Sequence, residues 1–149
     1  MHRDIKIENI LIEEQKRLVK IIDFGFSICS ASKLKVFCGT PTYMAPEIVS
    51  KTEYCGKKAD VWALGIVLYV LLCGKFPFRG LSDAELYKKI RSCSFETPAF
   101  LSEKCSHLLR KILRFNPSER PDCTEVRNIP KKTNNTFFII KITYFLNIY

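Results

Sequence analysis

Two short apolar runs near the start of the chain predict a pair of β-strands. Residues 10–12 read Ile-Leu-Ile and residues 18–22 read Leu-Val-Lys-Ile-Ile, and branched side chains of this kind favour strands. The stretch 13–17 between them is polar. A polar connection of this length between two short strands is typical of a β-hairpin, so we expect a small antiparallel hairpin here.

The next segment, residues 23–47, lacks a hydrophobic period and is rich in residues that form turns. It contains Gly25, Gly39, Pro41 and Pro46. We therefore predict a long irregular loop, and a loop of this length within a compact domain usually has a function.

Beyond Asp60 the pattern becomes helical. Residues 61–73 are apolar on nearly every side, which predicts a central buried helix that Gly74 and Pro77 end. This apolar run is too short to cross a bilayer, so we expect no transmembrane segment.

Three further helix starts follow. Ser82 and Glu85 have the spacing of a capping box. Ser102 is expected to cap a helix that Pro117 stops. The apolar face of that helix would consist of Leu108, Leu109, Ile112 and Leu113. The stretch 122–125 has the composition of one more helix start.

Length and charge narrow the class of protein. A chain of 149 residues favours one domain, and 47% hydrophobic residues are enough to form a core. The net charge is +9, but the Lys and Arg residues are scattered and no basic stripe alternates with aromatic residues. We therefore expect no nucleic-acid partner. The first residues also lack the charged and apolar regions of a signal peptide.

The seven cysteines include no C-x-x-C pair. An odd number without paired spacing fits neither a disulfide framework nor a zinc site. Reduced, mostly structural thiols are typical of a cytoplasmic protein, with a nuclear location as the alternative.

Two polar strings, one on each side of the predicted hairpin, carry the groups that phosphoryl transfer to a hydroxyl needs. That chemistry requires a carboxylate that orients the hydroxyl and takes its proton, a cation on the phosphate, and oxygen ligands for Mg²⁺. Asp4, Lys6 and Asn9 supply one of each, and Asp23 adds a second carboxylate. The hairpin would return Asp23 to the side of Asn9.

In their order and spacing, five strings resemble the eukaryotic protein kinase family. They are H-R-D-x-K-x-x-N at 2–9, D-F-G at 23–25, A-P-E at 45–47, D-x-W-x-x-G at 60–65 and R-P at 120–121. The resemblance covers residues 2–127 and implies a mainly α fold with a small β-hairpin, the C-terminal lobe of a protein kinase. It assigns residues 1–128 to this lobe and leaves 129–149 as a tail that departs from the family pattern.

The resemblance implies roles for the catalytic residues. Asp4 would be the catalytic base, Lys6 would stabilise the transferring phosphoryl group, and Thr40 would bridge the two and help to seat the substrate. The reaction would be ATP-dependent phosphorylation of serine or threonine hydroxyls on protein substrates.

The same resemblance implies a nucleotide site. Lys6, Asn9, Leu11 and Asp23 would bind ATP, with Leu11 under the adenine ring. Asn9 and Asp23 would be the Mg²⁺ ligands.

Other positions would be structural in a kinase. Glu47 and Arg120 would form a buried ion pair, and Asp60 would anchor the backbone of the catalytic loop. His2 and Phe24 would stack in a column of side chains between the two lobes.

Subclass is indicated by several short strings. Lys6 together with G-T-P-T-Y at 39–43 is similar to serine/threonine kinases rather than tyrosine kinases. The stretch 68–78 is similar to the calcium/calmodulin-dependent and AMP-activated kinase group. In this family a bulky residue such as Phe26 after D-F-G accompanies a preference for serine as the phosphate acceptor. Glu8 would favour a basic residue near the phosphorylated position of the substrate.

The chain also departs from the family. It contains no G-x-G-x-x-G string, so we expect the N-terminal lobe to be absent, an apolar face to be exposed where that lobe would sit, and the isolated chain to be inactive. The alternatives are a non-catalytic kinase-like binding module and a non-functional truncated gene product.

Two regions leave regulation and origin open. Val36 stands where such kinases often carry a phosphothreonine that pairs with Arg3, and Ser30 or Ser32 would have to substitute. The tail 129–149 has three interpretations: out-of-frame translation, a native extension, or a strand that binds a membrane or a partner.

Overall fold

The computed structural model describes residues 1–13, 15–16 and 18–127, and the tail assigned to 129–149 lies outside this range. The described chain is mainly helical with one antiparallel hairpin, as predicted. The strands are β1 (Ile10–Glu13) and β2 (Leu18–Ile21), and the helices are α1 (Pro46–Val49), α2 (Gly56–Cys73), α3 (Asp83–Ser92), α4 (Glu103–Ile112) and α5 (Cys123–Arg127). Short 3₁₀ turns lie at Ile7–Asn9, Pro41–Tyr43 and Pro117–Glu119.

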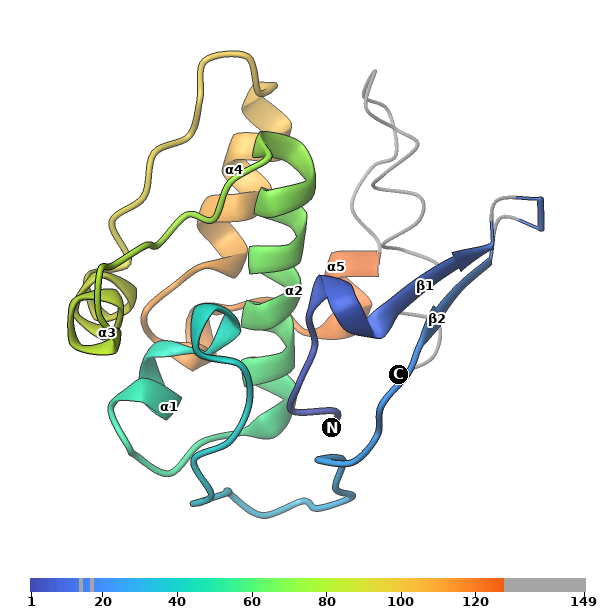
Figure 1. Ribbon diagram of the computed structural model, residues 1–149, viewed down its shortest axis with the longest axis vertical. Coiled ribbons are helices and arrows are strands. Elements are labelled where there is room, and N and C mark those ends of the chain that lie inside the picture. The colour runs from blue at the N-terminus through green and yellow to red at the C-terminus, as the bar shows by residue number, and fades with distance from the viewer. Residues whose placement is uncertain (14, 17, 128–149) are drawn as a thin grey trace.

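Helix α2 runs through the middle of the helical body, with α4 packed along it (Figure 1). It is buried on all sides from Ala59 to Tyr69, as its apolar sequence predicts. Gly65 lets α4 approach closely, because a Cβ there would lie 2.5 Å from a methyl carbon of Ile112. Trp62 stacks on Phe78 with ring centroids 5.7 Å apart.

The start of α2 differs from the prediction, whereas its end does not. The helix begins at Gly56, before Asp60, because its first turn is placed by packing rather than by an apolar period. A Cβ at Gly56 would lie 2.8 Å from the side chain of Met1, and neighbouring Lys57 is exposed. At the other end Gly74 adopts φ 67° and caps the helix, as expected.

The hairpin extends away from the helices (Figure 1). Ile10 pairs with Ile21 and Leu11 with Lys20, so the two faces of the hairpin are distinct. Val19 and Ile21 are buried against the body, whereas Leu11 faces solvent. Strand alternation therefore separates a buried face from an open face along β2, whereas Ile12 of β1, opposite Val19, is 45% exposed.

The predicted loop over 23–47 is irregular for most of its length, but it is not free of structure. It contains the 3₁₀ turn Pro41–Tyr43 and the first residues of α1. Leu34 forms an isolated antiparallel bridge with Tyr54, just before α2. The loop is thus tied down by a contact with a residue outside it, which local composition does not reveal.

The remaining helix starts agree with the sequence. Ser82 accepts a hydrogen bond from the Glu85 amide, and Ser102 accepts one from the Cys105 amide. Asp122 caps α5 in the same way. The predicted apolar face of α4 is buried, and its residues are Leu108, Leu109, Ile112 and Leu113.

The end of α4 is a correction. Pro117 was expected to stop this helix, but α4 ends at Ile112 and Pro117 opens a 3₁₀ turn instead. The chain leaves the helix early because the carbonyls of Arg114 and Phe115 turn toward the buried guanidinium of Arg120.

No helix in the described ranges is both long and apolar enough to cross a membrane. All seven cysteines are free thiols.

Candidate active site

The loop that carries the predicted catalytic residues is held by one carboxylate of α2. Asp60 accepts the backbone amides of His2 and Arg3 at 2.8 and 2.9 Å. Arg3 has a φ of 70°, which is uncommon for a side-chain-bearing residue and is maintained only by surrounding contacts. Asp60 thus occupies the anchoring position that the resemblance implied.

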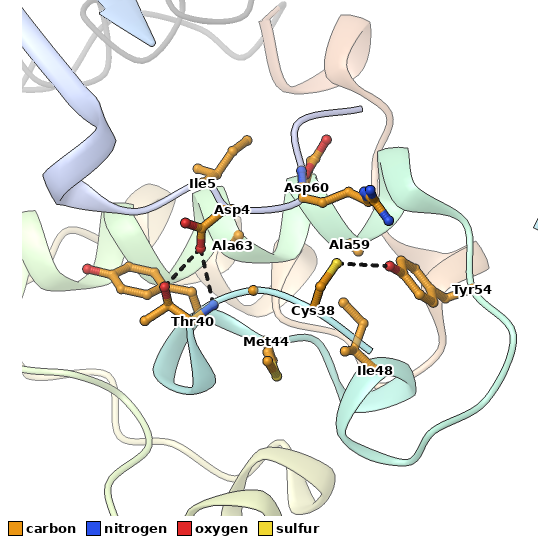
Figure 2. Close-up of a pocket in the computed structure, with 13 residues that line it drawn as sticks. Asp4, Ile5, Cys38, Thr40, Met44, Ile48, Tyr54, Ala59, Asp60 and Ala63 are labelled. Atoms are coloured by element: carbon orange, nitrogen blue, oxygen red, sulfur yellow. Dashed lines mark hydrogen bonds between the residues drawn. The ribbon is translucent and has the colours of Figure 1, made fainter. Parts of the chain in front are cut away.

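Asp4 lies at the centre of the site and is 5% exposed. One of its carboxylate oxygens accepts the Thr40 amide at 3.1 Å and the Thr40 hydroxyl at 2.8 Å, and Figure 2 shows this pair. The other oxygen lies 2.8 Å from the ammonium of Lys6. Lys6 also donates to the Thr40 hydroxyl at 3.1 Å, which closes a three-membered network.

This network controls the charge of both titratable groups. Burial opposes ionisation of Asp4, but the hydrogen bonds from Lys6 and Thr40 outweigh it and hold the pKa of the carboxyl below its usual value. The pKa of Lys6 is raised, chiefly by its hydrogen bond to Asp4. Both groups are therefore charged at neutral pH.

Asn9 packs beneath the same carboxylate. Its amide nitrogen donates to the Asp4 carbonyl at 3.0 Å and more weakly to the Asp4 carboxylate at 3.4 Å. The NH₂ end is thereby committed, and the amide oxygen is the end left for a ligand.

The hairpin returns Asp23 to this loop. The backbone amide of Ile22 donates to the Asn9 carbonyl at 3.0 Å, so the end of β2 lies against the catalytic loop. Asp23 follows with a φ of 63°, is exposed, and its charge helps to raise the pKa of Lys6. The structure therefore brings Asp4, Lys6, Asn9 and Asp23 together.

The donor set fits Mg²⁺. An amide oxygen at Asn9 and a carboxylate at Asp23 are hard oxygen ligands, and Mg²⁺ takes one or two carboxylates with phosphate and water completing its shell. No group of three or more His, Cys, Asp and Glu residues that could hold a metal occurs in the described part of the chain. The arrangement thus fits an ion that arrives with a phosphate and not a closed protein site.

Leu11 lies on the open face of the hairpin and is 51% exposed. It is one of several exposed apolar side chains on the two faces of the hairpin and on the segment after it. We call this set the hairpin face; its members are Leu11, Ile12, Leu18, Ile22, Phe24, Phe26 and Ile28. Large contiguous apolar surfaces on a protein are commonly covered by a partner or a ligand.

His2 and Phe24 are in contact, with ring centroids 5.0 Å apart in an edge-to-face arrangement. The His2 ring is buried and its Nε2 lies 3.1 Å from the Ile22 carbonyl. The contact joins the catalytic loop to the start of the segment 23–47.

Glu47 and Arg120 form the expected buried ion pair. Two parallel hydrogen bonds of 2.7 Å join the carboxylate and the guanidinium. The Arg120 side chain is fully buried, and its guanidinium lies 5.0 Å from the Trp62 ring centroid. The pair links α1 to the segment that precedes α5.

Sequence reasoning missed Tyr54. Its hydroxyl donates to the Val36 carbonyl at 3.0 Å and lies 3.9 Å from the Cys38 sulfur (Figure 2). With the Leu34 bridge, Tyr54 holds three positions of the loop that leads to Thr40. An aromatic residue within a polar stretch was the available signal, but nothing in the sequence indicated that it is buried or what it contacts.

Tyr43 was also missed. Its hydroxyl accepts the Ile7 amide at 3.4 Å and lies 3.5 Å from the Glu8 carboxylate.

The cavity drawn in Figure 2, lined by Asp4, Thr40 and other residues beneath the catalytic loop, has about 20 Å³ of space. That is room for a water molecule and not for a substrate.

The fold and a comparison with known protein families indicate the same class of protein. Residues 1–130 match the protein kinase domain family, and this chain belongs to that family. CBL-interacting serine/threonine-protein kinase 15 of Arabidopsis thaliana is 47% identical over 124 residues, which is 80% of this chain and 29% of that protein.

Two further relatives come from other lineages. Serine/threonine-protein kinase ppk25 of Schizosaccharomyces pombe is 39% identical over 139 residues, or 92% of this chain and 33% of its own. Probable serine/threonine-protein kinase MARK-A of Dictyostelium discoideum is 39% identical over 145 residues, or 96% of this chain and 14% of its own. The chain thus spans a third or less of these relatives. The family prediction is confirmed.

Proposed function

We propose that this chain supplies the substrate- and metal-binding half of a serine/threonine protein kinase. The observation that carries the proposal is the network of Asp4, Lys6 and Thr40, with Asn9 and Asp23 beside it. These groups have the charges that phosphoryl transfer requires, and they come from three separate segments.

In the proposed reaction, Asp4 accepts a hydrogen bond from a serine or threonine hydroxyl of a protein substrate and takes its proton as the oxygen bonds to the γ-phosphorus of ATP. The bond from that phosphorus to the ADP oxygen breaks, and the electron pair stays with ADP. Because the pKa of Asp4 is lowered, its first task is to orient the hydroxyl, and the proton transfers late.

The other residues hold charge and position. Lys6 places a cation where the transferring phosphoryl group develops charge, and Thr40 keeps Asp4 and Lys6 in register. Asn9 and Asp23 would hold Mg²⁺, which when bound neutralises phosphate oxygens. Leu11 offers an apolar surface for the adenine ring.

Two finer statements complete the proposal. The 149 residues contain no G-x-G-x-x-G string, so by themselves they lack the Gly-rich loop that lies over the ATP phosphates in kinases. We propose that the isolated chain therefore catalyses phosphate transfer very slowly. Free thiols at all seven cysteines favour a cytoplasmic or nuclear location.

A chimeric enzyme tests the function. The matching segment of the Schizosaccharomyces pombe relative is replaced by residues 1–130, and phosphate transfer to a serine peptide is measured. We expect transfer, and we expect Asp4→Asn to reduce it by about 10²–10⁴-fold. The matched control is Asp83→Asn, which makes the same carboxylate-to-carboxamide change at an exposed position on α3. A folded chimera without activity would contradict the proposal.

A second function, a non-catalytic binding module, is favoured by the exposure of the hairpin face. In that case a partner would cover this face and the chemistry would be unused. Retention of a partner by the Asp4→Asn chain, combined with an inactive chimera, would favour this function.

A further inference from the structure

A second pocket lies away from the catalytic loop, where the segment after α3 meets the end of α4. It encloses about 400 Å³ and is open to solvent. Its main lining residues are Cys93, Phe95, Arg110, Arg114, Phe115 and Glu119. A volume of this size accommodates a few side chains of a ligand. Neither the proposed reaction nor the nucleotide site uses any of these residues.

The wall of the pocket formed by Cys93 and Phe95 is uncharged and packed against the core. Phe95 packs edge-on against Tyr69 and Phe78, with ring centroids 5.8 and 6.0 Å away. Burial raises the pKa of the Cys93 thiol to about 11, so this wall is uncharged at neutral pH. A large apolar side chain entering here would meet the aromatic ring of Phe95 and the uncharged thiol of Cys93.

The rim is basic and partly aromatic. Arg114 has 57% of its side chain exposed, and its only described acidic contact is with Glu119 at 3.9 Å. Arg110 donates to the Thr97 hydroxyl at 2.6 Å, which holds it in place without neutralising it. Phe115 is 58% exposed beside them.

The charge continues along the outer side of α4. Lys104 and Lys111 are exposed on this helix, so with the two rim arginines these four cations outnumber the acidic Glu96, Glu103 and Glu119, and Glu96 is already paired with Lys75. The charge around the pocket is therefore net positive, which favours ligands with carboxylates.

The rim is also pre-organised from below. Arg120 donates to the carbonyls of Arg114 and Phe115 at 2.8 and 3.1 Å while its guanidinium is paired with Glu47. The backbone of the rim is thus fixed by a buried ion pair. A rigid rim loses little conformational entropy when a ligand binds.

We propose that this pocket is a docking site for an acidic peptide segment of a partner protein. One large apolar side chain of that segment enters the space beside Phe95 and Phe115, and flanking carboxylates pair with Arg110 and Arg114. The occupant is acidic because the rim and α4 are basic, and it carries an apolar anchor because the interior is aromatic. The pocket is separate from the residues of the proposed reaction, so it would give the protein a further surface for binding a partner protein.

Fluorescence anisotropy of the complete chain tests the site. The probe is a labelled peptide in which single phenylalanines alternate with pairs of glutamates. We expect saturable binding that weakens as salt is raised and is lost when the glutamates are replaced by lysine or the phenylalanines by alanine. The double variant Arg110→Glu and Arg114→Glu should weaken binding by about tenfold or more.

The matched control is Lys88→Glu with Arg91→Glu on α3, where both residues are exposed and lie outside the pocket. This variant has the same change in net charge and should bind within about threefold of the unmodified chain. Thermal unfolding confirms that both variants are folded. Absence of saturable binding, an equal loss in both variants, or full binding by the pocket variant would each overturn the proposal.

Discussion

Thr40 donates two hydrogen bonds to the same carboxylate oxygen of Asp4, from its amide at 3.1 Å and from its hydroxyl at 2.8 Å. The loop that ends in the Pro41–Tyr43 turn is thereby fastened to the catalytic loop. The contact also fixes the orientation of the Asp4 carboxylate, which in the proposed reaction would set the position of the substrate hydroxyl.

The two hydrogen bonds from Thr40 predict how the pKa of Asp4 changes when Thr40 is substituted. Thr40→Val removes the hydroxyl donor and keeps the amide, so the pKa of Asp4 should rise toward its usual value. Carbon-detected NMR titration of the Asp4 carboxyl measures it. Thr97→Val, which also removes a bonded threonine hydroxyl but far from the site, should leave the value unchanged.

The same lowered pKa has a consequence for stability. A carboxyl with a folded-state pKa below its unfolded value stabilises the fold above the unfolded pKa, and this contribution is lost as pH falls through the folded value. Unfolding of the unmodified chain should therefore show an acid-dependent loss below about pH 4 that is smaller in Asp4→Asn. Equal pH dependence in the two proteins would contradict it.

The ion pair of Glu47 and Arg120 should be costly to break from one side. Arg120→Met leaves a buried carboxylate and three backbone carbonyls without their donor, and we expect a loss of about 3–5 kcal/mol in the free energy of unfolding. Urea denaturation measures it. Adding Glu47→Gln to this variant should recover part of the loss, since the unpaired charge is then gone. Lys35→Met, which breaks the exposed ion pair with Glu53, is the control. An equally small loss of unfolding free energy in Arg120→Met would show that the buried ion pair contributes little.

Tyr54 should control the order of the loop before Thr40. Tyr54→Phe removes the hydrogen bond to the Val36 carbonyl, which is typically worth about 1 kcal/mol. Hydrogen exchange at residues 36–38 should then become faster. Tyr69→Phe removes a similar hydrogen bond, to the Glu96 carbonyl, and should not affect these amides. Unchanged exchange in Tyr54→Phe would mean that the backbone bridge with Leu34 is sufficient.

The hairpin face should bind a hydrophobic dye. Phe24 is 57% exposed and Leu11 is 51% exposed, so the isolated chain should enhance the fluorescence of anilinonaphthalene sulfonate. Leu11→Ser with Phe26→Ser should reduce the signal, whereas Leu81→Ser, at a fully exposed position outside this face, should not. A stable monomer that binds no dye would show that the face is not available.

Much of the site could be read from residue order. Asp4, Lys6, Asn9 and Asp23 were recognised because phosphoryl transfer restricts which side chains can serve and how far apart they can lie along a loop and a hairpin. Their roles in catalysis remain predictions. Helix caps at Ser82 and Ser102 were equally readable, since a cap is a contact over a few residues.

What the sequence by itself determined was therefore local: the hairpin, the buried character of α2, the caps, and the family to which the chain belongs. Only the tertiary structure decided where α2 begins, where α4 ends, and that Tyr54 holds the loop before Thr40. Each of these depends on a contact between residues far apart in the chain. Periodicity and propensity describe neighbours in sequence, whereas close packing at Gly56 or the donors of Arg120 exist only once the chain has folded back on itself.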